Sequence, residues 1–101
     1  MASAQLTSRA RRELGEATRW ISRESPKAAR GLRRAVVNAA RLLGEHPSAG
    51  ALRPDIAGER YRFLVLTGYP YILIYDAEHR PPVITRIVHG ARDLPELLRD
   101  L

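Results

Sequence analysis

The chain has 101 residues and contains no cysteine. This absence excludes disulfides, zinc sites built on thiolates and cysteine nucleophiles. The apolar runs are short, so the sequence predicts no helix that crosses a membrane. Near the N-terminus, Arg9, Arg11 and Arg12 arrive too early for the apolar core of a signal peptide. We therefore expect a soluble, cytoplasmic protein with no membrane partner.

Lysine is also scarce, because 16 of the 17 basic residues are arginine. Guanidinium groups bind carboxylates and phosphates through two parallel hydrogen bonds, which is one explanation of this bias. A GC-rich genome, which favours arginine, alanine, glycine and proline codons, is the other. Residues 1–41 hold ten basic and three acidic residues, whereas residues 42–101 hold seven and eight. The positive charge therefore lies in the N-terminal part and favours an acidic partner, either nucleic acid or an acidic protein segment.

Hydrophobic residues make up 45% of the chain, a fraction too high for a disordered protein. The length fits one domain, which we place at residues 1–101. No phosphate loop, dinucleotide fingerprint or nucleophile elbow is present. His46, His79 and His89 do not have the spacing of a metal site, so we expect neither a metal nor another cofactor.

The N-terminal half has the pattern of a helix hairpin. Apolar residues recur at helical spacing over residues 9–23 and again over residues 26–44, with Ser8 and Ser25 as the expected N-caps. Because the connection between the two segments is short, the helices should be antiparallel. Residues 4–7 form a candidate edge strand ahead of them.

The C-terminal half has the pattern of a sheet. Apolar residues alternate with others over residues 61–66 and 83–89, and residues 71–75 are apolar on both faces. Asp93 then begins a short final helix, whose apolar side is supplied by Leu94, Leu97, Leu98 and Leu101. The predicted fold class is α+β: an N-terminal antiparallel helix hairpin packed on a small three- to four-stranded antiparallel sheet, with a short C-terminal helix.

This arrangement predicts one sheet face under the hairpin and a second face with little cover. We expect Leu64 and Leu66 on the second face, together with either Ile72 and Ile74 or their neighbours. A short terminal helix would cover little of it. We therefore predict an incompletely covered apolar surface with arginines at its margin, which is typical of a binding site.

The densest polar cluster runs from Arg86 to Asp93. His89 is a candidate general base or phosphate contact, but it could equally hold the turn through a backbone hydrogen bond. Arg92 has two interpretations, an anion contact and an ion pair with a carboxylate. Asp93 is interpreted first as a helix cap.

Other arginines and Trp20 are weaker candidates. Arg60 and Arg62 project from one strand face, either as a phosphate-binding pair or as a solvated edge. Trp20 is expected in the core. Three arginines share one face of each helix, and solvated helix faces are the default interpretation: Arg12, Arg19 and Arg23 in the first helix, and Arg30, Arg34 and Arg41 in the second.

The string from Arg86 to Leu94, RIVHGARDL, is similar to the signature of the ParE branch of the ParE/RelE toxin superfamily. The order of elements and the segment YRFLVLTGYPYILIYDA resemble the same superfamily of bacterial type II toxin–antitoxin modules, over nearly the whole chain. The resemblance implies the fold described above. It also implies one of two activities.

RelE-like toxins cleave mRNA on the ribosome with basic strand residues and a C-terminal acid–base group. By this resemblance, Arg62 and Arg92 match two of the basic positions of RelE-like enzymes. The catalytic set of a RelE-like enzyme would then be Arg62, His89 and Arg92. Leu64, Ile72 and Leu98 stand at the remaining positions, and such side chains cannot shuttle protons or stabilise a phosphorane. The chain therefore resembles the ParE branch, in which no catalytic residue is expected.

ParE-like toxins inhibit DNA gyrase by binding it, and they are neutralised by a cognate antitoxin. The resemblance implies a hetero-oligomer in which an acidic, apolar antitoxin tail folds into the groove between hairpin and sheet. DNA would be contacted only indirectly, through the antitoxin. The expected residues fall into two sets: for target or partner binding Arg62, Arg86, His89, Arg92 and Asp93, and for antitoxin docking Arg12, Arg19, Arg30 and Arg34. The alternatives are a ribosome-dependent endoribonuclease and a degenerate, non-toxic homologue.

Overall fold

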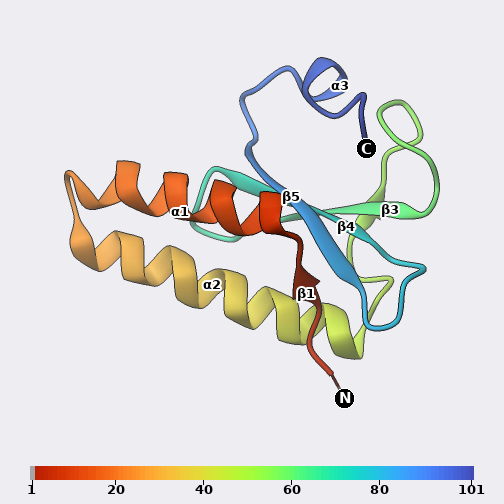
Figure 1. Ribbon diagram of the computed structural model, residues 1–101, viewed down its shortest axis with the longest axis horizontal. Coiled ribbons are helices and arrows are strands. Elements are labelled where there is room, and N and C mark those ends of the chain that lie inside the picture. The colour runs from red at the N-terminus through yellow and green to blue at the C-terminus, as the bar shows by residue number, and fades with distance from the viewer. Residues whose placement is uncertain (1) are drawn as a thin grey trace.

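A helix hairpin lies against a five-stranded sheet, and a short helix follows the sheet (Figure 1). The computed structural model describes residues 2–101. Its elements are, in chain order, β1 (Gln5–Leu6), α1 (Ser8–Ser22), α2 (Pro26–Glu45), β2 (Ala51–Leu52), β3 (Tyr61–Val65), β4 (Tyr71–Asp76), β5 (Val83–His89) and α3 (Leu94–Leu97). This confirms the predicted α+β class, with the helix pair first and the short helix last.

The hairpin forms because both helices begin at a hydroxyl cap and bury one apolar stripe. Ser25 caps α2 by accepting a hydrogen bond from the Ala28 amide at 3.1 Å, as expected. The prediction that Ser8 caps α1 was wrong by one residue, since Thr7 accepts the Ala10 amide at 3.1 Å. Thr7 is better placed because its backbone is extended, as an N-cap requires, whereas Ser8 is already helical.

The sheet has the strand order β1-β5-β4-β3-β2, and every pair is antiparallel except β1 with β5. It therefore has five strands and one parallel pair, where the alternation pattern predicts three or four antiparallel strands. β1 lies within the edge strand that is predicted at residues 4–7, whereas β2 was not predicted. Both strands are two residues long, too short to show a repeat of two. β1 and β2 lie at opposite edges of the sheet, and the hairpin of α1 and α2 connects them.

The two sheet faces are both covered. On the hairpin side, Leu66, Leu73 and Ile87 pack with the apolar stripes of the helices, and Leu64 borders the same cluster. The prediction that Leu64 and Leu66 occupy the open face was therefore wrong. Leu64 pairs with Leu73, which faces the hairpin, so the register places the even-numbered residues of β3 there.

The second face carries its own cluster, built from Phe63, Ile74 and Val88. Leu94 and Leu98 close it from the C-terminal segment, and Figure 1 shows α3 on the other side of the sheet from α2. The prediction of an incompletely covered face was thus wrong over most of this face. The C-terminal leucines cover it because the chain continues past α3 to bring Leu98 onto the sheet, where it is 1% exposed.

Tyr75 fastens the loop after α2 to the sheet. Its buried hydroxyl donates to the Pro47 carbonyl at 2.6 Å and accepts from the Gly50 amide at 2.8 Å. Gly50 is required there, because a Cβ atom would lie 2.7 Å from the tyrosine ring. Burial raises the pKa of the Tyr75 hydroxyl above its usual value of 10.0.

We expect the Tyr75→Phe variant to lose about 1–3 kcal/mol of the free energy of unfolding, because a buried amide and carbonyl lose their partner. The raised pKa means that Tyr75 stabilises the fold fully below pH 10 and less as the pH rises above it. Urea unfolding at pH 8 and at pH 10.5 measures both effects. Tyr61→Phe, at a half-buried tyrosine, is the control, and an equal response of the two variants would contradict the assignment.

Candidate functional site

A groove of about 400 Å³ lies between α1 and the outer edge of β5. The edge is free for a groove because β1 pairs with β5 only at Val83 and Ile84. Beyond that point α1 runs beside the strand, as Figure 1 shows. The groove is lined by Glu13, Glu16, Ala17 and Trp20 of α1, by Arg86, Ile87, Val88 and His89 of β5, and by Tyr71, Arg92 and Leu97.

Glu13 and Arg86 form the wall that joins α1 to β5. The Arg86 guanidinium donates from Nη2 to the Glu13 carboxylate at 2.8 Å and from Nε at 3.0 Å, and Nη1 donates to the Leu97 carbonyl at 3.1 Å. The same carboxylate accepts the Ile87 amide of the strand edge at 3.0 Å. Glu13 therefore takes the place that a neighbouring strand would have, and one carboxylate connects the hairpin, the sheet and the C-terminal segment.

This wall changes the interpretation of Arg86, which the sequence places in the partner-binding set. Arg86 is only 3% exposed, and its donors point to groups of the protein itself. A guanidinium held in this way stabilises the groove and does not present a cation to a partner. Glu13 was missed, although it is one of only three acids in the basic first 41 residues, and that isolation is a signal.

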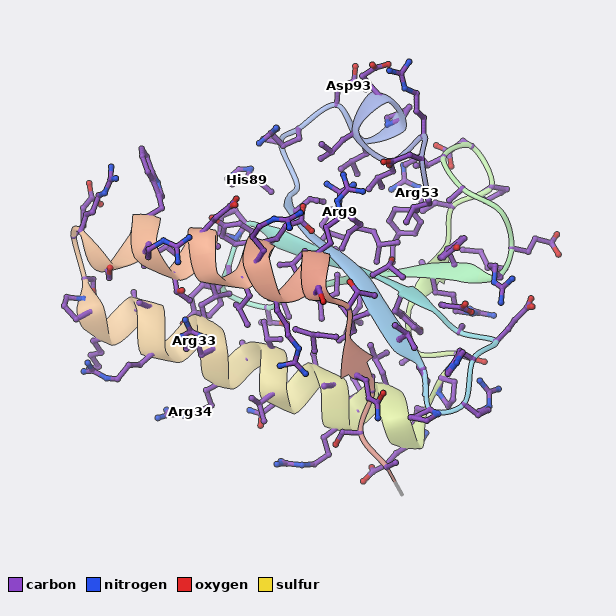
Figure 2. All side chains as sticks on the ribbon, in the orientation of Figure 1. Arg9, Arg33, Arg34, Arg53, His89 and Asp93 are labelled. Atoms are coloured by element: carbon purple, nitrogen blue, oxygen red, sulfur yellow. The ribbon has the colours of Figure 1, made fainter. Side chains whose placement is uncertain are left out.

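His89 lies at the end of β5, where the groove meets the turn into α3 (Figure 2). Its Nδ1 atom accepts the Ala91 amide at 3.1 Å, and its ring stands edge-on to Tyr71 with 5.4 Å between centroids. The turn-holding interpretation is therefore the one that the geometry supports. Nδ1 is thus engaged with the backbone of the turn.

Three further side chains complete the surroundings of the groove. Arg92 lines it and is exposed. Asp93 precedes α3 in the cap position but makes no side-chain capping bond, so that expectation was wrong in its detail. Trp20 is 64% exposed, stacks under Arg23 at 5.1 Å and lines the groove, which corrects its prediction as a core residue.

Arg62 lies away from this groove. It pairs across the sheet with Tyr75, whereas His89 pairs with Tyr71, so the two lie four residues apart along β4, about 13 Å. They also flank β4 on opposite sides. The Arg62 guanidinium donates to the Gly50 carbonyl at 2.9 Å and is thus used in holding the loop after α2.

The four helix arginines assigned to antitoxin docking do not share one pocket. Arg30 and Arg34 line a second hollow on α2, whereas Arg12 and Arg19 lie exposed on α1. Figure 2 shows Arg34 pointing away from α1, while Arg33 lies between the helices, where its Nη2 donates to the Thr18 hydroxyl at 3.1 Å. The sequence shows that these residues share helix faces but not how the two helices are turned toward each other.

Over residues 2–101, no group of three or more His, Asp or Glu side chains is placed to hold a metal ion. None of the helices in this part of the chain is long and apolar enough to span a membrane.

The family model for the ParE toxin of the type II toxin–antitoxin system parDE matches residues 4–94. The chain belongs to this family. The match confirms the ParE assignment that the string from Arg86 to Leu94 predicts, and it extends from β1 into α3.

The fold is also that of solved structures, of which eight chains match. A chain of the structure described as "Chromosomal ParDE TA system from P. aeruginosa" has 22% sequence identity and a TM-score of 0.70. The alignment covers 88% of this chain and 96% of that chain, so the likeness shows a shared fold over almost the whole length. No curated protein sequence matches the chain.

Proposed function

We propose that this ParE-family chain is a bacterial toxin that inhibits DNA gyrase by binding it in the cytoplasm, and that a cognate antitoxin neutralises it. The observation that carries the proposal is the family match over residues 4–94. The structure described for the similar chain is itself a ParDE toxin–antitoxin system. A binding function also agrees with a groove in which Glu13 and His89 are hydrogen-bonded to groups of the protein itself.

The antitoxin is proposed to occupy the groove between α1 and β5. Trp20 and Tyr71 offer apolar area to a tail that folds on binding, and Arg92 at the rim offers a cation to its acidic residues. Arg12 and Arg19, on the exposed side of α1, extend the positive charge beside it. An acidic, apolar tail fits this combination better than a neutral or basic one.

RNA cleavage is the second candidate function, and the geometry argues against it. The set Arg62, His89 and Arg92 would have to surround one phosphate, yet Arg62 lies on the far side of β4 and donates to the protein backbone. His89 uses Nδ1 to accept the Ala91 amide. A general base needs a free lone pair within hydrogen-bond reach of the proton that it removes. A third possibility, a non-toxic homologue, requires no particular geometry.

A supercoiling assay tests the proposed function. The purified chain is expected to inhibit gyrase at micromolar concentration and to leave ribosome-bound mRNA intact in a parallel reaction. Arg92→Ala should weaken inhibition without any change in mRNA. Cut mRNA without gyrase inhibition would replace the proposal by the endoribonuclease, and the Arg92→Ala and His89→Ala variants would then lose cleavage.

Expression in a bacterial host tests the antitoxin part. Growth should stop on expression and resume when the product of the adjacent reading frame is co-expressed. The Arg12→Glu/Arg19→Glu variant should be rescued less well, and its complex with that product should lose part of its salt dependence. Growth that never stops would favour the non-toxic homologue.

A further inference from the structure

The outer side of α2 carries a row of positive charge that the groove does not use. Its members are Lys27, Arg30, Arg34 and Arg41, and we call them the basic face. All four side chains are exposed, and none forms an ion pair within residues 2–101. By contrast Arg9, Arg53, Arg60, Arg86 and Arg99 each have an acidic partner. Unpaired charge is thus concentrated on the hairpin.

The charge of α2 is also arranged against its own dipole. The first turn has no acid and holds Lys27, with Arg30 one turn further on, whereas the last turn has no base and ends in Glu45. Cations near a helix N-terminus and anions near its C-terminus each lower the stability of the helix. If these charges stabilised α2 by itself, acidic residues would lie near its N-terminus and basic residues near its C-terminus. The basic face therefore suits an anionic partner better than it suits the isolated helix.

A hollow of about 550 Å³ opens beside this face. It is lined by Ser25, Lys27, Ala28, Arg30, Gly31, Arg34 and Tyr69, three of which are cations and none of which is an acid. Tyr69 reaches α2 from the turn between β3 and β4 and closes the hollow against Gly31. Apart from this tyrosine the lining offers no large apolar side chain.

We propose that the basic face of α2 binds the phosphate backbone of duplex DNA directly, beyond the indirect contact through the antitoxin that the family resemblance implies. A folding protein tail gains its binding energy from apolar area, which this lining lacks, whereas phosphates bind through cations and counterion release. Binders of single strands stack bases on aromatic platforms, and the basic face has no aromatic row. That the duplex is DNA, and not another nucleic acid, rests on the proposed function, because gyrase acts on DNA.

The dimensions of the basic face agree with a duplex. From Lys27 to Arg41 the helix rises by about 21 Å, because each residue adds 1.5 Å. At 3.4 Å per base pair this length corresponds to about six base pairs. Arg30, Arg34 and Arg41 share one side of the helix and could contact successive phosphates along this length without any base contact.

Fluorescence anisotropy with a labelled 20-base-pair duplex of mixed sequence, over 50 to 200 mM salt, tests the proposal. Removing three cations from the basic face in Arg30→Gln/Arg34→Gln/Arg41→Gln should weaken binding at least tenfold. The slope of log affinity against log salt should become shallower by about 2.7, which is three phosphates at 0.9 each. An unchanged midpoint of urea unfolding shows that the triple variant keeps its fold.

A charge-matched control removes three arginines elsewhere, in Arg53→Gln/Arg80→Gln/Arg99→Gln. Figure 2 shows Arg53 on the opposite side of the molecule from Arg34. This control should bind within threefold of the unaltered chain. An equal loss in both triple variants, or no binding at 50 mM salt, would overturn the proposal. Competition by polyglutamate as strong as by unlabelled duplex would overturn it in favour of an acidic protein partner.

The measurement uses free DNA and no gyrase, so it is independent of the target. A chain that binds the duplex through the basic face but leaves supercoiling unchanged would overturn gyrase as the target and leave the DNA surface in place. A chain that inhibits gyrase but does not bind the duplex would overturn the DNA surface and leave gyrase in place as the target.

Discussion

Replacing Glu13 by alanine is expected to lower the free energy of unfolding by about 3–5 kcal/mol, the range for removing one partner of a buried ion pair. The Arg86 guanidinium is almost fully buried, so without Glu13 its charge would have no counter-charge. The Ile87 amide would lose its acceptor at the same time. A small domain has only about 5–15 kcal/mol in total, so the loss is large. Urea unfolding measures it.

Glu16→Ala is the matched control for this prediction. Glu16 lies one turn further along α1 and is exposed, so its loss should change the free energy by no more than about 0.5 kcal/mol. Glu13→Gln keeps an acceptor for the Ile87 amide and should fall between the two. The Glu13→Ala/Arg86→Leu double variant should recover part of the loss, because it removes the buried charge as well. Equal stability of the Glu13→Ala and Glu16→Ala variants would contradict the assigned role.

Replacing Leu98 by alanine is the second change with a large expected effect, about 2–5 kcal/mol. Leu98 is 1% exposed and packs against Phe63, Ile74 and Val88 on the second sheet face. The shorter side chain would remove apolar contacts and leave a cavity that the short α3 segment can fill only in part. The loss should appear as a lower urea midpoint with little change in the slope of the transition.

Leu42→Ala makes the same chemical change at a leucine of α2 that is 40% exposed. Its cost should be well below that of Leu98→Ala, since less buried area is lost. If the two variants were equally stable, the C-terminal segment would not close the second sheet face. An open apolar face, as the sequence predicts, would then return as the candidate binding surface.

The helices and the three long strands could be predicted because each repeats its pattern several times. The repeat over residues 83–89 predicts β5 with its observed ends, and the cap at Ser25 predicts the start of α2. β1 and β2 have two residues each, so their identity depends on their partners, which are β5 for β1 and β3 for β2. Which face Leu64 takes depends on register, and a shift of one residue reverses every side chain.

Some residues of the candidate groove could be named from the sequence. His89 and Arg92 line it, and their role in binding stays a prediction. The family resemblance places Arg62 in the same set of residues, but Arg62 lies across the sheet from the groove. Matching a family motif does not tell how close two residues are in space. Glu13 is 73 residues away from Arg86, and no local pattern indicates such a pair.

By itself the sequence determined the family, the α+β class, the basic character of the hairpin and the lack of cysteine chemistry, because these depend on composition, local repeats and one continuous string. Only the tertiary structure decided which arginines are paired and which are free. It also decided that the C-terminal leucines cover the second sheet face and that a carboxylate of α1 completes the edge of β5. The reason is physical: burial and pairing depend on contacts between residues that are distant in the chain, and they determine what each side chain can do.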